Sequence, residues 1–347
     1  MKRTTLFSAI FCSASLILEL HFYSLRNKNM SKSILVLTLI LFVCALSTNA
    51  FGQGVVVNES QADETFRVTL IGTGVPPVDP NRMGSAVLVE AGKHKLLFDV
   101  GRGASINIKR HGLNLASVTR VFLTHLHGDH VTGLPDFWLS SYHRNNGKRA
   151  EPLPITGPVG VAYMVSNLEV AYRDVMKSWL SYAKPGFDVT EISAEGAVFE
   201  EDDLRVTAFK VNHGTDPAYG YKIDYKGRST VISGDTGYSE NLIQYSKGTD
   251  LLIHGIFDFE PTDSNEITIS KATLERLKVV HTVPEDAAKV FNAVAPKMAV
   301  AYHLSPALDS ERLNKKITGI YSGVFIIGED LMTFEIGDGV RLVQGAQ

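Results

Sequence analysis

The feature that most constrains this chain is a run of metal-binding side chains directly after an apolar stretch. Residues 121–130 read Val-Phe-Leu-Thr-His-Leu-His-Gly-Asp-His, which places the imidazoles and the carboxylate at His125, His127, Asp129 and His130. His125 and His127 alternate with Leu126, so they can converge on one cation as the chain leaves a buried strand. Gly128 lets the chain turn, so that the last two polar side chains can reach a second cation. Imidazole and carboxylate together suit Zn²⁺, and also Fe or Mn, better than Ca²⁺ or Mg²⁺.

Three later segments each deliver one more polar side chain at the end of an apolar run. These residues are His213 after Phe209-Lys-Val-Asn, Asp235 after Ser229-Thr-Val-Ile-Ser-Gly, and His303 after Met298-Ala-Val-Ala-Tyr. In α/β proteins, sites are usually built where strands end. Any one of these residues alone fits a hydrogen-bonded core or loop position. Together with the first cluster, they supply enough ligands for two coordination spheres.

This series of residues resembles the metallo-β-lactamase fold superfamily, over about residues 66–334. The resemblance implies an α/β protein with a four-layer αββα sandwich, which binds two Zn²⁺ ions per chain, or Mn or Fe in their place. It implies a first metal on His125, His127 and His213, a second metal on Asp129, His130 and His303, and a bridge at Asp235.

Two positions indicate the branch of this superfamily. True β-lactamases of the fold carry Cys, Ser or a similar residue where this chain has Asp235, and the oxygen-reducing di-iron branch has Glu where it has His127. Hydrolysis at a dinuclear centre is therefore the expected chemistry. The segments 209–225, 238–242 and 281–303 look most like the arylsulfatase-like branch, which is close to ribonuclease Z.

The chain departs from ribonuclease Z at several places. Gly255 stands where that family usually has a glutamate, His303 is followed by Leu-Ser-Pro, and the basic, Gly/Pro-rich arm that grips tRNA is missing from the sequence. The insert 143–200 reads as helical instead. Its apolar residues recur at steps of three and four, at Met164, Leu168, Tyr172, Val175, Trp179 and Tyr182. This face is expected to pack on the domain, and the alternative is that Trp179 or a tyrosine also lines the substrate pocket.

The resemblance also assigns catalytic roles. Asp129 would be both a ligand and a proton acceptor, and the nucleophile would be a metal-bridging hydroxide. His281 matches a histidine that protonates the leaving oxygen in ribonuclease Z, and the alternative is a polar residue at a helix start. His254 is expected to hydrogen bond to a ligand. Asp99 is expected to orient the histidines or to fix its own turn.

Residues 1–52 are expected to be a leader, and Met30 the true start. A basic residue, Lys32, precedes the apolar run Ile34 to Leu46, which at about 13 residues is short of the roughly 20 that span a bilayer. Small residues follow near Ala50 to Gly52. Both cysteines, Cys12 and Cys44, fall in this leader. The prediction is a periplasmic or secreted protein, with one hydrolase domain over 53–347 and no membrane anchor after cleavage.

Charge argues against nucleic acid as a partner. The leader carries five basic residues and one acidic residue, so subtracting its +4 from the net −3 of the chain leaves about −7. Nucleic-acid binding rests mainly on Lys and Arg. The expected substrate is therefore a sulfate ester or a related small anionic ester, with a ribonuclease Z-like phosphodiesterase as the alternative and a metal-binding protein without turnover as a third class. A homodimer is left open.

Overall fold

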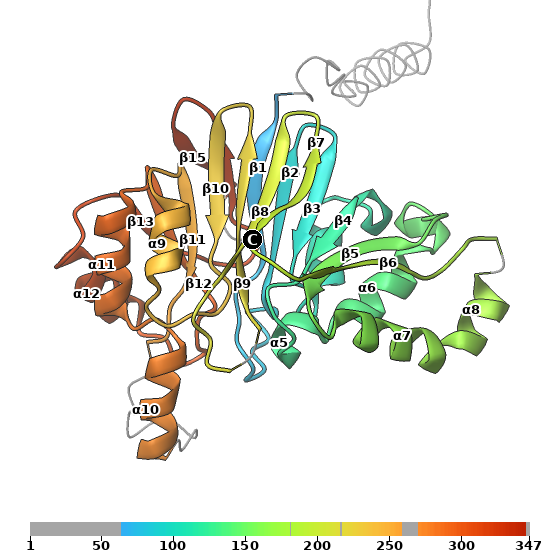
Figure 1. Cartoon of the computed structure of the whole chain (residues 1–347), viewed down its shortest axis with the longest axis horizontal. Coiled ribbons are helices and arrows are strands. Elements are labelled where there is room, and N and C mark those ends of the chain that lie inside the picture. The colour runs from blue at the N-terminus through green and yellow to red at the C-terminus, as the bar shows by residue number, and fades with distance from the viewer. Residues whose placement is uncertain (1–63, 181, 216, 259–269, 345–347) are drawn as a thin grey trace, which may run out of the picture. The chain divides into compact units, whose positions relative to one another are not determined.

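The computed structural model describes residues 64–180, 182–215, 217–258 and 270–344. They fall within a compact unit, Ser60–Gln347, and the predicted leader lies outside the described residues. Two β-sheets form the centre of this unit, and helices lie beside each of them (Figure 1). Among the described residues, no helix has the length and apolarity needed to span a membrane.

The first sheet has eight strands in the order β15-β14-β1-β2-β3-β4-β5-β6. Its strands are β1 (Phe66–Gly72), β2 (Ala86–Ala91), β3 (His94–Phe98), β4 (Arg120–Phe122), β5 (Leu153–Pro158), β6 (Phe187–Ile192), β14 (Thr333–Ile336) and β15 (Val340–Gln344). The strands β3 to β6 run parallel to one another, whereas β1 pairs antiparallel with β2 and β14. The carboxyl ends of β4 and β5 therefore meet at one edge of this sheet.

The second sheet has seven strands in the order β13-β12-β11-β10-β9-β8-β7. Its strands are β7 (Gly196–Glu201), β8 (Leu204–Lys210), β9 (Tyr219–Tyr225), β10 (Arg228–Ile232), β11 (Leu251–Gly255), β12 (Met298–Tyr302) and β13 (Phe325–Ile327). The strands β10 to β13 are parallel, which brings the loops after β10 and β12 to one edge.

Helices cover the outer face of each sheet. The described helices are α4 (Ala104–Arg110), α5 (Gly128–Val131), α6 (Leu134–Ser141), α7 (Val161–Ala171), α8 (Arg173–Trp179), α9 (Glu240–Ser246), α10 (Lys271–Val280), α11 (Pro284–Val294) and α12 (Ser310–Thr318), with 3-10 turns at Leu115–Ser117 and Arg144–Asn146. Helix α10 has no buried residue and extends away from the sheets (Figure 1). One apolar cluster joins α4, α6 and α7 to the first sheet, and another joins α9, α11 and α12 to the second. A third cluster lies between the two sheets.

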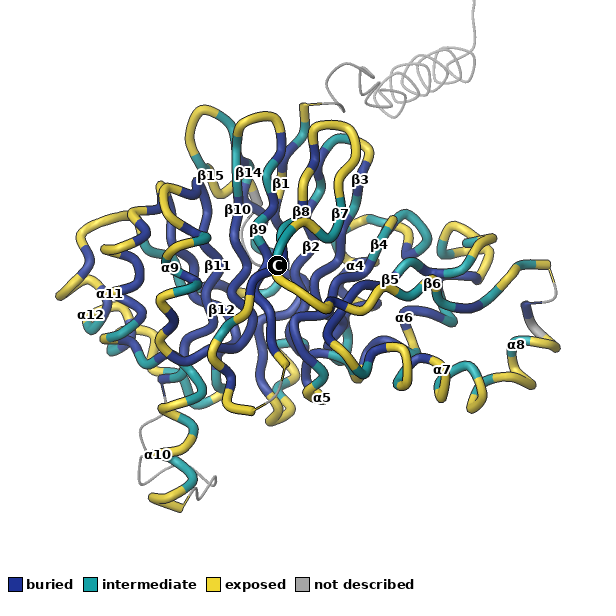
Figure 2. The backbone as a smooth tube through the Cα atoms, viewed as in Figure 1, coloured by how far each residue is buried: buried dark blue, intermediate teal, exposed yellow. Residues whose placement is uncertain are grey.

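The predicted four-layer αββα arrangement is confirmed by these three clusters. Strand β11 shows why its sequence is apolar throughout: Leu251 and Ile253 pack between the sheets, while Leu252 packs under the helices. A strand that is covered on both faces has no solvent side on which to place polar residues. Figure 2 shows the central strands as mostly buried and the outward faces of the helices as exposed.

The prediction of a helical insert over 143–200 is only partly correct. Strands β5, β6 and most of β7 lie within it, and only α7 and α8 are long helical stretches. The apolar period runs through 164–179, but β5 and β6 pair with neighbouring strands of the first sheet. The helix also breaks at Tyr172, whose backbone angles (φ −102°, ψ 10°) divide α7 from α8.

Candidate metal centre

The predicted ligands meet at the edge where β4, β10 and β12 end. After β4, the chain passes through Thr124 and His125 and begins the short helix α5 at Gly128. His127 is the N-cap residue of α5, so the helix turn points Asp129 and His130 back toward the sheets. From the second sheet, Asp235 follows β10 and His303 follows β12 directly.

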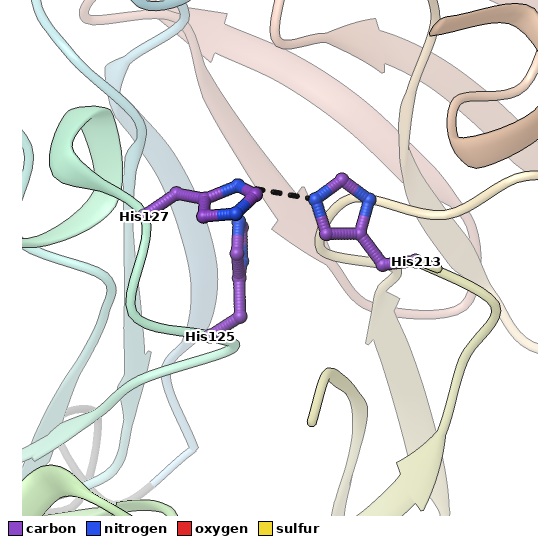
Figure 3. Close-up of side chains that lie close together, drawn as sticks. All are labelled: His125, His127 and His213. Atoms are coloured by element: carbon purple, nitrogen blue, oxygen red, sulfur yellow. Dashed lines mark hydrogen bonds between the residues drawn. The ribbon is translucent and has the colours of Figure 1, made fainter. Parts of the chain in front are cut away.

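His125, His127 and His213 form what we call the first cluster. The ligating atoms of the three rings lie within 4.8 Å of one another. Nε2 of His213 lies 3.2 Å from Nδ1 of His127, and the three rings face a common point (Figure 3). His125 and His213 are buried, whereas His127 is exposed. An incoming cation would find three nitrogen donors here, one of them at the solvent boundary.

Asp129, His130 and His303 form the second cluster, and all three are buried. Nε2 of His303 lies 3.0 Å from Oδ2 of Asp129, and Nε2 of His130 lies 3.4 Å from the same oxygen. Burial opposes the charge of Asp129, but the neighbouring side chains of His130 and His303 hold the pKa of this carboxyl well below its usual range. Asp129 therefore stays ionised and available to a cation.

Asp235 lies between the two clusters. Its Oδ2 is 3.9 Å from Nε2 of His125 in the first cluster and 3.3 Å from Nε2 of His303 in the second. Its Oδ1 is 3.5 Å from Nε2 of His130. This is the position that a bridging carboxylate requires.

The polar atoms at this centre fit metal ions. Nε2 of His125, Nε2 of His130 and Oδ1 of Asp235 are buried without a hydrogen-bond partner among the described residues. Buried polar atoms nearly always have a partner, so three such atoms directed at one region indicate a missing ligand. Nitrogen and carboxylate donors of this kind suit Zn²⁺ and related transition metals. The two clusters are consistent with a dinuclear metal site.

Asp99 both orients a ligand and fixes its own turn. Its Oδ2 accepts a hydrogen bond from Nδ1 of His130 at 2.7 Å, which leaves Nε2 of that ring directed at the centre. The same carboxylate accepts hydrogen bonds from the backbone N–H and the hydroxyl of Thr124, both at 2.8 Å. Oγ1 of Thr124 also lies 3.0 Å from Nδ1 of His125. Thr124 was missed as a site residue, because a threonine beside a histidine motif carries no distinctive signal in the sequence.

Two site residues adopt left-handed backbone conformations. Asp99 has φ 60° and His303 has φ 57°, in a region that residues other than glycine rarely occupy. Such conformations persist where the surrounding structure holds them, and they gather at functional sites.

His281 lies beside both clusters. It is the C-cap residue of α10 and lies three residues before α11. It is therefore at the end of a helix, whereas the alternative prediction placed it at the start of one. Its Nδ1 donates to the carbonyl of Leu277 at 3.1 Å, and its Nε2 lies 3.3 Å from Oδ2 of Asp235. Burial opposes its charge, but the Asp235 carboxylate raises the pKa of His281. His213, Asp235 and His281 also form a group that could hold a cation, so His281 has two candidate roles.

The expected hydrogen bond from His254 to a ligand is wrong. The ring is fully buried, neither nitrogen has a partner among the described residues, and it packs on Phe291 of α11 at a centroid distance of 5.8 Å. His254 lies two residues after Leu252 on β11, so it is on the same face of the strand, the one that packs under the helices. Burial lowers the pKa of His254 to about 3.

The apolar face of the insert packs mainly on the domain, as expected. Met164, Leu168 and Tyr172 lie against the core of the first sheet. Val175 and Tyr182 line a groove of about 650 Å³ with residues of α6, and none of the predicted metal ligands lines it. The side chain of Trp179 lies outside the described part of the chain. The hypothesis that a tyrosine of this face lines the substrate pocket therefore gains no support.

Comparison with known proteins identifies the family to which the chain belongs. The model of the Anti-Pycsar protein Apyc1 family matches residues 66–292. Ribonuclease Z of Mycobacterium bovis is 30% identical over 284 residues, an alignment that covers 78% of this chain and 98% of the relative. Ribonuclease Z of Mycobacterium avium is also 30% identical, with the same coverage of both chains.

Solved structures share the fold. The metallo-β-lactamase fold protein YhfI from Bacillus subtilis superimposes with a TM-score of 0.64 at 19% identity, covering 78% of this chain and all of its own. The short form of human tRNase Z gives a TM-score of 0.58 at 24% identity, covering 78% and 99%. These comparisons favour the ribonuclease Z side of the resemblance over the arylsulfatase-like branch. The chain belongs to the Anti-Pycsar protein Apyc1 family and is a metal-dependent hydrolase of the metallo-β-lactamase fold, in the branch that includes ribonuclease Z.

Proposed function

We propose that this protein is a phosphodiesterase that cleaves small phosphodiesters, with a cyclic nucleotide as its substrate. The observation that carries the proposal is the shared carboxylate of Asp235 between the two clusters, in a chain whose family model is that of cyclic nucleotide phosphodiesterases. We propose Zn²⁺ as the metal, two ions per chain, since three nitrogen donors in one cluster favour it over Mg²⁺. Mn and Fe suit the same donors.

The chemistry divides between the metals and the protein. Bound divalent cations would lower the pKa of water and offset the charge of the phosphoryl oxygens. The carboxylate of Asp129 stays ionised at neutral pH, so it can accept a hydrogen bond from the attacking water and orient it. Asp99 and Thr124 hold His130 and His125 in the tautomers that direct Nε2 inward.

His281 is the proposed proton donor to the leaving oxygen. The carbonyl of Leu277 accepts a hydrogen bond from Nδ1–H of His281, so only the protonated ring also presents an N–H donor at Nε2. The Asp235 carboxylate raises the pKa of His281, which favours this protonated form. Its ring stacks against that of His303 at 5.9 Å and lies 5.0 Å from that of His213, so the leaving group would depart beside α10.

A second candidate is ribonuclease Z activity on tRNA precursors, which the 30% identity to the mycobacterial enzymes favours. The overall charge opposes it, because binding to nucleic acid requires many Lys and Arg contacts with phosphates. The residue after His254 is also glycine, where that family usually has a glutamate. A small substrate with one or two phosphates needs neither a basic arm nor a large basic surface.

A panel of substrates tests the proposal. Zinc-loaded protein would be assayed with cyclic purine and pyrimidine nucleotides, bis(4-nitrophenyl) phosphate, a tRNA precursor and 4-nitrophenyl sulfate, with D235A as the inactive control. The highest kcat/KM is expected on a cyclic nucleotide, with no cleavage of the tRNA precursor. Preferred cleavage of the precursor would establish the second candidate, and preferred cleavage of the sulfate would return the arylsulfatase-like alternative.

Export is a separate proposal that rests on the leader sequence. We propose that the mature protein starts between about Phe51 and Gly54 and lies in the periplasm or the medium. Sequencing the amino terminus of protein recovered from each fraction tests this. Recovery of residues before Met30 would contradict both the cleavage and the start at Met30.

A further inference from the structure

Asp330 accepts four hydrogen bonds in the turn between β13 and β14, where the chain crosses from one sheet to the other. Its Oδ1 accepts from the backbone N–H and the hydroxyl of Thr73, at 2.9 and 2.7 Å. Its Oδ2 accepts from the backbone N–H of Met83 at 2.8 Å and from the side chain of Asn107 at 2.9 Å. One carboxylate therefore joins this turn to three positions that lie far earlier in the sequence.

The first of these segments supports His303. The carbonyl of Thr73 accepts a hydrogen bond from the N–H of Leu304 at 2.7 Å, directly after the ligand. His303 itself has φ 57°, so its conformation depends on contacts that hold the chain on either side. By fixing Thr73, Asp330 fixes the residue that follows this strained position.

The second segment supports Asp129. Met83 precedes Gly84, and a Cβ on Gly84 would lie 2.8 Å from the carbonyl oxygen of Asp129. Only glycine allows the backbone to approach the ligand so closely. The N–H of Gly74 also donates to the carbonyl of Met83 at 2.7 Å, which ties the two segments together. A shift of Met83 would therefore displace Gly84 and change its contact with the backbone of Asp129.

The first cluster is supported from elsewhere. His213 donates from Nδ1 to the carbonyl of Val280 at 2.9 Å, and His125 is held by Thr124. Among the described residues, the hydrogen-bond partners of Asp330 are Thr73, Met83 and Asn107, and none of them is one of these supports. We propose that Asp330 is a positioning residue that selectively holds the second cluster in its metal-binding geometry. This inference concerns the dinuclear centre and does not depend on the identity of the substrate.

The variant D330N exposes this role with little change in shape. An asparagine amide can accept hydrogen bonds only at its oxygen, and its NH₂ group must face one side of the site. Either orientation places that NH₂ group against a backbone N–H, of Thr73 or of Met83. One of the two supporting segments therefore loses its anchor, and contacts of this outer kind typically change metal affinity by roughly 10- to 100-fold.

Zinc binding by the purified full chain tests the proposal, with stoichiometry and affinity measured in a competing chelator. D330N is expected to bind the zinc ion of the second cluster 10- to 100-fold more weakly and the ion of the first cluster normally. E329Q, a change at the exposed neighbouring residue, is the matched control and is expected to bind both ions like the parent. At a zinc concentration where D330N and H127A each retain one ion, the double variant H127A/D330N is expected to retain none.

The double variant distinguishes selective support from general damage. If D330N acted on the first cluster, H127A/D330N would still retain one ion, and the proposal would be overturned. Equal weakening of both sites in D330N, or no weakening, would also overturn it. Should D330N fail to fold, T73V takes its place, because it keeps the backbone hydrogen bond to Asp330 but removes the hydroxyl. T73V with unchanged affinity for the ion of the second cluster would then count against the proposal.

Discussion

The two clusters hold similar donors in different surroundings. In the second cluster, every residue is buried. Asp99 accepts a hydrogen bond from His130, Thr73 accepts one from the residue after His303, and Gly84 packs against the backbone of Asp129. In the first cluster, His127 is exposed, and His213 donates a hydrogen bond to the carbonyl of Val280 at the end of α10. None of the residues of α10 that the structure describes is buried, so this support is less firmly packed.

This difference separates the roles of the clusters. Rigid ligands with fixed outer contacts give geometry and affinity, whereas a ligand at the solvent boundary allows entry and exchange. We therefore expect the second cluster to hold its metal more tightly, and the first to exchange its metal with solvent.

The largest effect should follow from removing the carboxylate that both clusters share. D235A is expected to lose both metal ions together and to lower turnover by roughly 10³-fold or more, since no charge stabilisation by the metals remains. Metal content per chain and kcat are the measurements. D174A, at a carboxylate that is 89% exposed on α8, serves as the control. A D235A protein that retained two ions would remove Asp235 from the bridge.

His281 adjoins both clusters, and its variant decides whether it is a ligand or an acid. H281A is expected to keep both ions and to lose about 10²- to 10⁴-fold in turnover, the usual contribution of general acid–base catalysis. The loss should shrink for a nitrophenolate leaving group, which departs without a proton, and be greatest for alkyl esters. Loss of one ion would instead make His281 a ligand, and equal losses across the series would make its role structural.

The difference in support can be measured on the metal-free protein. H130A should lower the free energy of unfolding by about 1–3 kcal/mol, because it leaves a cavity and removes the buried donor to Asp99. H127A should change it by less than about 0.5 kcal/mol, as exposed positions usually do. Urea unfolding of both variants gives the comparison. Similar losses in the two variants would contradict the contrast between a supported and an open cluster.

The smallest effect concerns a buried histidine that has neither a metal nor a carboxylate. The pKa of His254 is about 3 in the folded protein, against an ordinary 6.5. Between these values the unfolded chain binds a proton that the folded protein does not, so stability falls as the pH falls, by about 1.4 kcal/mol per unit. H254L should lose less stability than the parent between pH 6.5 and 5.5, in urea unfolding without metal. H143Q, at an exposed histidine, should lose as much stability as the parent over this pH range. If H254L lost as much stability as the parent, the His254 ring would be accessible to water and the prediction would be wrong.

Much of the centre was predictable because its ligands follow strand ends. The runs before His125, Asp235 and His303 are apolar, and each became the buried strand that the pattern predicts. The structure brings the seven predicted ligands together in two neighbouring clusters, with Asp235 between them. The insert shows the limit of such patterns, since its strands depend on partners in the first sheet rather than on their own sequence.

The sequence by itself determined which residues could bind metal, the order in which they occur and the layered fold that carries them, because strand and turn patterns are local. The tertiary structure alone decided how each ligand is held. Asp99 pairs with His130, and Asp330 forms hydrogen bonds with residues more than 200 positions earlier. His254 is packed in the helix layer, where neither of its nitrogens has a hydrogen-bond partner among the described residues. Such contacts leave no periodic signal, because they depend on which segments the packed sheets bring together.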